Sequence, residues 1–576
     1  MKAFNKGTDK MRQCVFSLLL MSALSVGAQE KISINGQCGY NVSDIEKIEV
    51  IKVPKDVASV LEAQGEYSLF AEALEKTGLA DSVCVWRTGK TFEMYDNHGR
   101  PGSGFAGSEY YYPTNLVKKY TLLAVDDNAL KSYGIKDFAS LKEKCVEWYG
   151  NANQWYTAPK ISTGEDYTYT YNVVNMFVRY HILKCGIPAS KLVNMRNASD
   201  ENWNFAFGGE PYSYFETMLP HTMLKVWQPL YHNTGKSTNV WVNRYRANNT
   251  LTDEYWSYGS EGMHPIVDDG ALLNMEKSDI KAVNGYIHNI SKPLVYDRQV
   301  VEGVLNERMR VDVEDMVPEL ANNGMRSLSP FECAVLNREQ NGVYDGTMCR
   351  IPYNYFENMK LSTEHVQMGV YSHGSWRAWN SQQFVLWNNW KGESAYIDIK
   401  LPPVPSDGEY EIRLPYCPMF AGIVFQTYLD GKKIGEPVDG RYPNTSLEED
   451  RKATGYLLVD EFDDYGVESD KTLRSNGYMR SPASFSRGGY NHVKLLVSSP
   501  DDLIRNVSNS CRYEEGYGTS LIRRVIGPVH LTQGEDHWLR IENTGGNVEG
   551  NTFTLDYIEI VPQSVYGNST YTEDWY

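Results

Sequence analysis

Apolar residues recur at helical spacing in the first half of the chain. In residues 68–80 the apolar positions fall three to four apart, and Gly78 stands where a helix would end. Residues 172–184 carry a second apolar face of this kind, followed by Gly186. These patterns predict two amphipathic helices that bury one side each.

Shorter apolar runs between these segments are typical of strands. Residues 120–125 form one such run, and the Asp-Asp-Asn sequence after it offers side-chain oxygens that cap the start of a helix. Residues 279–296 alternate around Asn284 and Gly285, a pair that favours a tight turn between strands. The sequence therefore predicts a strand followed by a capped helix, and a later β-hairpin.

The pattern changes to short alternating runs from about residue 345 onward. These runs are separated by Gly, Pro and Asn, which argues for an antiparallel sandwich. We expect strands within residues 395–401, 408–414, 492–497, 538–541 and 553–561. The preceding residues 298–344 are predicted to be a helical linker, with the boundary near a Ser- and Pro-containing break at 327–330.

The ordered segments of the first half resemble the fasciclin (FAS1) domain family. The opening helix is followed by a segment like residues 120–130, by the pair Tyr180 and His181, and by a closing segment with Asn284, Gly285 and His288. The resemblance covers residues 58–297, with insertions around 83–118, 150–170 and 230–275. It implies an α+β domain with helices packed on a small β-sandwich, and a role of the Tyr-His pair in domain integrity and adhesion.

The end of the second half is similar to the last strand of galactose-binding-like jelly rolls, the fold of many carbohydrate-binding modules. Residues 555–562 carry this resemblance. We therefore expect an all-β antiparallel jelly-roll sandwich over residues 345–563, followed by a tail of residues 564–576. An N-terminal extension, residues 29–57, precedes the fasciclin-like domain.

The first 28 residues have the features of a secretory signal. A basic stretch precedes an apolar run, and small residues lie before a cleavage point after Ala28. No later segment has the roughly 20 apolar residues of a membrane helix. We expect an exported protein at the outer membrane, the cell surface or the periplasm, without a transmembrane segment in the mature chain. Its scattered cysteines are expected to be mainly buried thiols rather than zinc ligands.

Charge and aromatic content narrow the class of partner. The net charge of −17 makes electrostatic binding to phosphate backbones unfavourable, so we do not expect nucleic acid as a partner. The 41 Tyr and 13 Trp residues supply rigid, flat contact area. This balance favours polar surfaces that bind a glycan or a protein or peptide ligand by stacking.

A tryptophan-rich segment is the candidate ligand-binding surface. It contains Trp376, Arg377, Trp379, Trp387 and Trp390. Indole faces beside Arg, Asn and Gln are suited to sugar recognition. The alternative is core packing, because alternation along a strand sends Trp387 and Trp390 to opposite faces.

Metal and catalytic chemistry have weaker support in the sequence. The acidic segment with Asp460, Asp463 and Asp464 could ligate calcium, or form a solvated loop, and no other cofactor is expected. His181 and His288 could act as bases, but neither a nucleophile elbow nor a zinc-binding helix accompanies them. A buried histidine that bonds to the backbone is the alternative, and we assign no catalytic residue.

These features lead to three hypotheses about function. The first is a non-enzymatic envelope protein that captures glycan or peptide beside an outer-membrane uptake receptor, as the resemblance implies. The second is a secreted glycan-degrading hydrolase whose carboxylates lie in a cleft between domains. The third is a purely structural adhesin.

Overall fold

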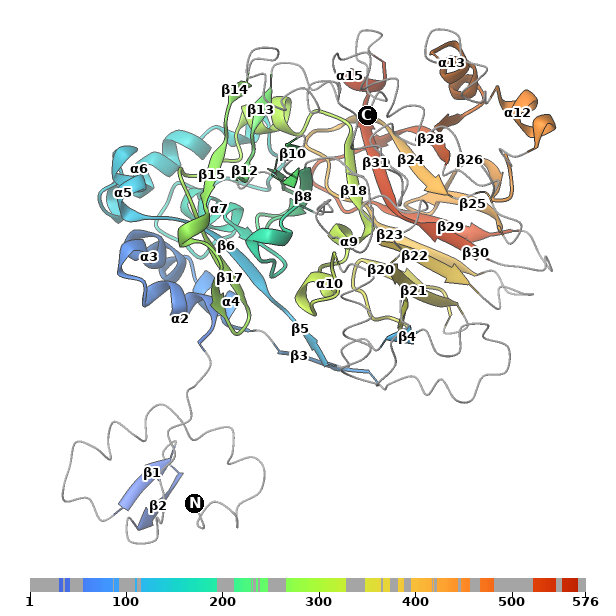
Figure 1. Ribbon diagram of the computed structural model, residues 1–576. Coiled ribbons are helices and arrows are strands. Elements are labelled where there is room, and N and C mark those ends of the chain that lie inside the picture. Colours follow the sequence, from blue (N-terminus) through green and yellow to red (C-terminus); the bar gives the residue numbers. More distant parts are fainter. Residues whose placement is uncertain are drawn as a thin grey trace.

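The chain combines a half that mixes helices and strands with a half built almost wholly from strands (Figure 1). This division agrees with the predicted α+β domain followed by a β-rich one. We call residues 55–296 the α+β half, residues 298–327 the connecting segment and residues 348–567 the β-rich half. The computed structural model describes residues 31–34, 37–41, 55–85, 87–92, 109–110, 115–193, 212–228, 230–231, 235–236, 239–246, 266–327, 348–363, 366–372, 382–387, 395–416, 418, 422–443, 447–455, 467–480, 522–544 and 552–567.

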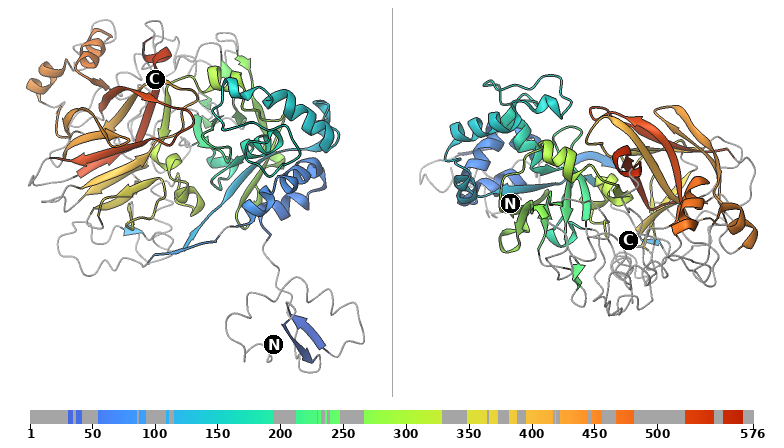
Figure 2. Two further views of the ribbon diagram at one scale, coloured as in Figure 1. Left: turned by 180° about the vertical axis from the view of Figure 1, so that it is seen from behind. Right: turned by 90° about the horizontal axis from the view of Figure 1, so that it is seen from above.

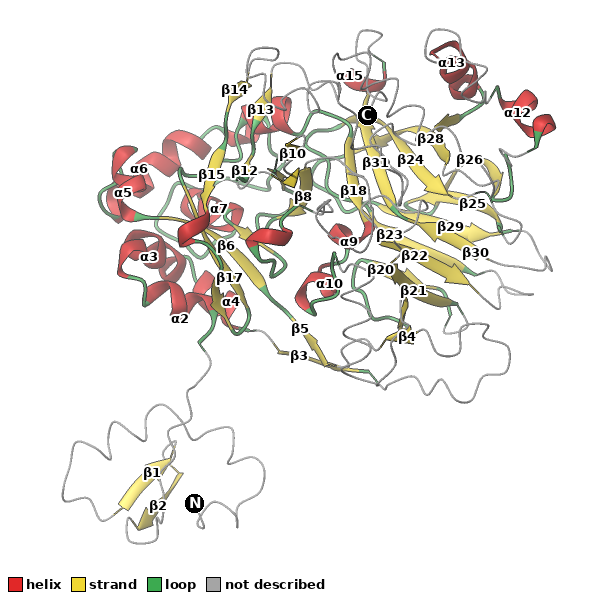
Figure 3. Ribbon diagram, viewed as in Figure 1, coloured by secondary structure: helices red, strands yellow, loops and turns green. Residues whose placement is uncertain are grey.

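Helices gather on the outer side of the α+β half (Figure 3). They are α2 (Val57–Glu62), α3 (Ser68–Lys76), α4 (Leu79–Cys84), α5 (Asp127–Ser132), α6 (Phe138–Tyr149) and α7 (Val173–Tyr180), with 3₁₀ turns at Gly65–Tyr67, Ala152–Gln154, Ala189–Lys191 and Met275–Lys277. As predicted, α3 buries one apolar face, and Gly78 follows it in the left-handed conformation with φ of 69°. The Asp126 carboxylate accepts bonds from the first-turn amides of α5, which confirms the predicted cap.

An eight-stranded sheet forms the centre of the α+β half. Its order is β7-β6-β17-β15-β12-β9-β8, and β16 pairs with β17. The strands are β6 (Tyr120–Val125), β7 (Ile182–Leu183), β8 (Tyr212–Glu216), β9 (Met223–Trp227), β12 (Trp241–Val242), β15 (Ala271–Asn274), β16 (Ile280–Ala282) and β17 (Gly285–Ile290). A bridge between Leu183 and Thr217 brings the two ends of the sheet together, so the sheet is nearly closed.

The predicted hairpin and the predicted second helix have different outcomes. Strands β16 and β17 pair antiparallel as the predicted hairpin, but the turn consists of Val283 and Asn284, one residue earlier than expected, because Gly285 already pairs with Ala282. Strand β17 also runs parallel to β6. The helix predicted over residues 172–184 ends at Tyr180, because Ile182 and Leu183 pair with β6 as strand β7. The helix is therefore shorter than predicted, because its last residues pair with a neighbouring strand.

Three five-stranded sheets build the β-rich half, and their pairings are antiparallel except for β4 with β19. The sheet orders are β18-β31-β24-β28-β27, β30-β22-β21-β19-β4 and β20-β23-β29-β25-β26. The strands are β4 (Glu109–Tyr110), β18 (Met309–Asp312), β19 (Met348–Ile351), β20 (Met359–Leu361), β21 (Gln367–Ser372), β22 (Gln382–Trp387), β23 (Tyr396–Lys400), β24 (Gly408–Tyr416), β25 (Val424–Leu429), β26 (Lys432–Asp439), β27 (Tyr478–Arg480), β28 (Ile522–Leu531), β29 (Trp538–Asn543), β30 (Thr552–Leu555) and β31 (Tyr557–Pro562).

The connecting segment lies between the two halves (Figure 1). It consists of a π-helical turn (Val300–Val304), β18, α9 (Val313–Met316) and α10 (Pro318–Asn322). It was expected to be helical, whereas β18 pairs with β31 at the edge of a sheet in the β-rich half. Strand β4, which comes from early in the chain, also joins a sheet of that half.

The remaining elements are short and peripheral. They are β1 (Lys31–Ile34) with β2 (Gln37–Asn41), β3 (Arg87–Thr91) with β5 (Asn115–Val117), β10 (Leu230–Tyr231) with β11 (Gly235–Lys236), β13 (Tyr245–Arg246) with β14 (Ile266–Asp268), and helices α12 (Glu448–Thr454), α13 (Val467–Ser475) and α15 (Gln563–Tyr566). The two halves lie side by side when viewed from above (Figure 2). Across the described ranges, no helix is long and apolar enough to cross a membrane.

Candidate functional site

The Tyr-His pair of the fasciclin resemblance is buried at the end of α7. The Tyr180 hydroxyl donates to the Met223 carbonyl at 3.1 Å and accepts from the Asn243 amide at 2.8 Å. His181 contacts the Phe177 carbonyl through Nδ1 at 2.8 Å, and its Nε2 accepts from the Leu294 amide at 3.0 Å. Burial lowers the pKa of His181 to about 4, so the ring is neutral and holds backbone groups in place.

The closing motif is buried in the same way. The Asn284 side chain accepts from the Val57 amide and donates to the Val83 carbonyl, so it ties the start of β17 to α2 and α4. His288 accepts from the Asp279 amide at 3.1 Å and contacts the Ile187 carbonyl at 2.9 Å. Both predicted histidines therefore have the structural role of a backbone-bonded buried residue, and burial lowers the pKa of His288 as well.

Gly285 occupies a position that a larger residue could not. Its φ is 148°, and a Cβ atom placed on it would lie 1.8 Å from the carbonyl oxygen of Tyr120. Gly285 and the Tyr120 carbonyl are this close because β17 pairs parallel with β6, and Gly285 lies opposite Tyr120 in this pairing. The glycine is thus required by strand packing.

The other predicted site residues lie outside the described residues. This applies to Trp376, Arg377, Trp379 and Trp390, and to Asp460, Asp463 and Asp464. Trp387 is the last residue of β22, but its side chain is not among those described. Within the described ranges no group of three or more His, Cys, Asp or Glu residues is placed to hold a metal ion. Of the cysteines described, Cys145 and Cys185 are buried free thiols, as expected, and Cys84 is an exposed one.

A cleft of about 440 Å³ opens where the two halves and the connecting segment meet. This volume lies in the range of small-ligand pockets. Its walls come from three parts of the chain. They are Thr88, Leu116, Val117, Lys118, Tyr120, Arg179, Lys184, Cys185, Phe215, Glu216, Met218 and Met223 from the α+β half, Val311, Asp315, Met316, Pro318, Glu319 and Asn322 from the connecting segment, and Glu357, Asn358, Lys400, Leu401, Pro402 and Pro403 from the β-rich half.

Glu319 is a buried acid of the cleft. It lies on α10, is 6% exposed, and accepts a bond from the Glu357 amide at 2.8 Å through Oε1. Its Oε2 is buried and has no hydrogen-bond partner among the residues that the structure describes. Burial raises the pKa of Glu319 to about 7, against the smaller effect of the backbone amides that it accepts from. Much of the Glu319 population is therefore protonated at neutral pH.

Charged pairs lie on both sides of the boundary between the two halves at the cleft, and one further contact crosses it. Lys184 pairs with Glu216 on the α+β side, and Lys400 pairs with Asp536 at 2.9 Å on the β-rich side. His221 of the α+β half approaches Asp536 to 3.5 Å. Of these contacts, the one between His221 and Asp536 crosses the boundary between the halves, and burial lowers the pKa of His221.

Two cations of the cleft have no carboxylate partner among the described residues. Lys118 is exposed, whereas Arg179 is half-buried and donates to the Asn175 side chain at 2.5 Å and to the Met218 carbonyl at 3.4 Å. Burial lowers the pKa of Arg179 from its usual value. The other acids of the cleft are paired, since Asp315 binds Arg326 at 2.6 Å and Glu357 binds Lys90 at 3.2 Å.

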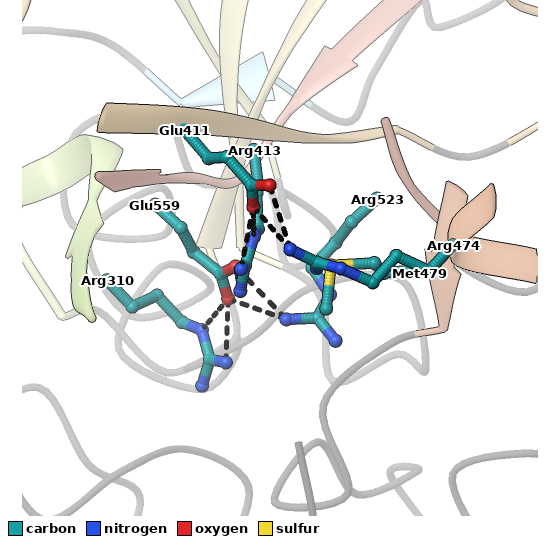
Figure 4. A network of polar contacts seen from close by, with 7 residues as sticks. All are labelled: Arg310, Glu411, Arg413, Arg474, Met479, Arg523 and Glu559. Carbon is teal, nitrogen blue, oxygen red and sulfur yellow. Dashed lines mark hydrogen bonds and ion pairs between the residues drawn. The ribbon is translucent and has the colours of Figure 1, made fainter. Parts of the chain in front are cut away.

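A second polar cluster, none of whose residues lines the cleft, lies on the β18-β31-β24-β28-β27 sheet (Figure 4). Glu559, which is fully buried, accepts from Arg310 at 2.8 Å and from Arg523 at 3.0 Å. Arg413 lies 3.6 Å from Glu559 and pairs with Glu411 at 2.8 Å. Burial alone would raise the pKa of Glu559, but the guanidinium groups hold it well below its usual range.

This cluster has a structural role. Its members come from β18, β31, β24 and β28, and Arg474 of α13 joins it by binding Glu411 at 2.8 Å. It therefore connects strands from distant parts of the sequence within one sheet, and it attaches helix α13 to that sheet. Removal of a buried carboxylate that is surrounded by guanidinium groups strongly destabilises a folded protein.

Sequence reasoning did not identify the cleft residues. Lys118, Arg179 and Glu319 are far apart along the chain and carry no motif. A weak signal exists at Glu319, because it follows Pro318 at the start of a short helix flanked by apolar residues. An acidic residue in such a setting is a candidate for burial, but its neighbours come from other parts of the fold.

Comparison with known proteins gives little further information. No protein-family model matches the chain, and no curated protein matches it. Among solved structures, part of the chain is similar to a Paenibacillus xanthan lyase determined to 2.6 Å, with 11% sequence identity and a TM-score of 0.19. The match covers 37% of this chain and 13% of the lyase. A likeness at this TM-score carries no argument about fold or activity.

Proposed function

We propose that the protein is an exported, non-enzymatic binding protein of the cell envelope that holds a glycan or peptide ligand in the cleft between its halves. The observation that carries this proposal is the composition of the cleft. Apolar walls, a few cations, two amide side chains and four acids, of which Asp315 and Glu319 have buried side chains, surround a volume of about 440 Å³. Such mixed surfaces bind polar ligands by contact area and a few oriented hydrogen bonds.

The proposal includes a fasciclin-like fold followed by a jelly-roll-like one. It is supported by the order of the motif residues along the chain, with Tyr180 and His181 at the end of α7, Asn284 directly before β17, and Gly285 and His288 in β17. The signal-like N-terminus supports export. A place beside an outer-membrane uptake receptor is the context that we propose for such a protein.

The first experiment separates binding from turnover. The mature protein is run through gels that contain soluble polysaccharides and is passed over immobilised peptide pools, and the same mixtures are assayed for new reducing ends and new amines. We expect retention by one ligand class without product. Product formation that scales with protein concentration would overturn the binding-only function.

One observation favours a second candidate function, a glycan hydrolase. Glu319 has a pKa raised to about 7, which suits a general acid, and the cleft contains other carboxylates, including Glu216 and Glu357. The variant Glu319→Gln keeps the shape of the side chain and cannot act as an acid. If the wild type releases reducing ends and this variant does not, the hydrolase is the correct assignment.

A further inference from the structure

The charges of the cleft favour a ligand that carries a carboxylate. Each lining acid except Glu319 has a cationic partner, and only about half of the Glu319 carboxyl groups are ionised at pH 7, against two cations without a carboxylate partner among the described residues. Lys118 and Arg179 therefore give the described part of the cleft an excess of positive charge. Arg179 is already partly removed from water, so a carboxylate would gain a charge-assisted bond there.

The apolar walls favour flexible apolar side chains over sugar rings. Met218, Met223 and Met316 line the cleft together with Pro402 and Pro403. Methionine adapts its shape to varied apolar groups and is common at surfaces that accept many peptides. These walls suit aliphatic side chains of different sizes.

The same cleft offers little surface on which a sugar could stack. Its described aromatic residues are Tyr120 and Phe215. Phe215 is about as buried as Met223 and Met316, but the guanidinium of Arg326 lies over its ring, 5.4 Å from the ring centre. One half-buried tyrosine remains, which is a small platform for a glycan.

From this geometry, and resting on the binding function proposed above, we propose that the cleft ligand is a short peptide with an apolar side chain and a free carboxylate. The apolar side chain packs against the methionines, and the carboxylate is held by Lys118 or Arg179. Asn322 and Asn358 line the same cleft with polar side chains, of which Asn322 Oδ1 accepts from the Gly186 amide and Asn358 Nδ2 donates to the Met316 carbonyl.

Methyl NMR on the whole mature protein tests the proposal. Methionine is labelled with ¹³C at its methyl carbon, and the signals are assigned with Met→Leu variants. The probes are acetyl-Ala-Leu-Ala with a free carboxylate, the same peptide as its amide, and acetyl-Ala-Asn-Ala with a free carboxylate. Maltohexaose and an oligogalacturonate serve as neutral and anionic glycan probes.

We expect the first peptide to shift Met218 and Met316 and to leave Met176 and Met368, which do not line the cleft, unchanged. The amide and the Asn-containing peptide should bind at least fivefold more weakly. Lys118→Met or Arg179→Met should remove the preference for the free carboxylate, while Lys136→Met, at an exposed position outside the cleft, should not.

Other outcomes overturn the proposal. If a glycan probe shifts these methionines and the peptides do not, the ligand class is wrong. If no probe shifts them although immobilised peptides retain the protein, the binding function stands and its site is elsewhere. If neither the NMR experiment nor the retention experiment detects a ligand, the binding function itself fails.

Discussion

At the scale of single residues, Glu319 combines burial with an unsatisfied oxygen. Its folded-state pKa of about 7 exceeds its ordinary value of 4.5. The folded protein therefore binds more protons than the unfolded chain between these two values, and stability falls as pH rises from about 4.5 to 7. Above pH 7 the loss is complete and constant.

The variant Glu319→Gln should remove this loss. Relative to the wild type, its free energy of unfolding should rise by about 2 to 3 kcal/mol between pH 4.5 and pH 8. Urea unfolding at both pH values measures the difference. Glu449→Gln, at an exposed position, is the control and should show no such pH-dependent gain. Equal behaviour of the two variants would mean that Glu319 ionises normally.

Glu559 is the opposite case, an acid held charged by several arginines. Because its folded-state pKa is depressed, its contribution to stability is present above about pH 4.5 and is lost as pH falls below that value. We predict that Glu559→Gln lowers the free energy of unfolding by about 3 to 5 kcal/mol at pH 7, since it leaves buried guanidinium groups without their shared carboxylate. Denaturant unfolding measures this loss, and Glu436→Gln, whose side chain is 85% exposed, should cost little.

At the scale of elements, the parallel pairing of β6 with β17 depends on Gly285. We predict that Gly285→Ala lowers the free energy of unfolding by about 3 kcal/mol or more, because the new methyl group meets the Tyr120 carbonyl and the backbone conformation disfavours a side chain. Gly65→Ala, with no atom within 4 Å of the new group, should change stability by less than about 0.5 kcal/mol. Similar losses in thermal unfolding for both variants would contradict the close approach.

The elements that sequence reasoning predicted well are those with local signals. The apolar face of α3, the Asp126 cap of α5 and the hairpin of β16 and β17, whose turn lies one residue earlier than predicted, all have signals within a few residues. The errors come from distant partners. Residues 182–183 form a strand because β6 lies beside them, and β18 forms because β31, more than 200 residues later, offers an edge.

At the scale of the whole molecule, the two halves contact each other through the turn between β28 and β29. Gln533 accepts from the Thr157 amide at 2.6 Å and is 2% exposed. We predict that Gln533→Ala lowers the free energy of unfolding by about 1 to 3 kcal/mol by leaving that amide without a partner. Hydrogen exchange at Thr157 should accelerate in this variant. Glu535→Ala alters the same turn, where Glu535 bonds to Thr532, and should leave Thr157 unaffected.

The cleft also depends on the arrangement of the whole molecule, which explains why it was not predicted from the sequence. Glu319, Arg179 and Lys400 meet because the connecting segment lies between the halves. Glutamate, arginine and lysine are common at protein surfaces, so these residues do not stand out in the sequence. Glu319 is buried by packing between distant segments, which no local sequence pattern indicates. The tryptophan segment and the acidic segment, in contrast, stood out in the sequence and remain predictions.

The central claim is that the cleft holds a ligand and does not convert it. Native mass spectrometry tests this most directly, with the wild type, Met218→Trp to fill the cleft, and Met275→Trp at an exposed site as the control. After a day with the peptide and glycan probes, we predict a complex with one intact probe for the wild type and the control, and none for Met218→Trp. A probe cleaved by the wild type, or equal binding by all three proteins, would contradict the account.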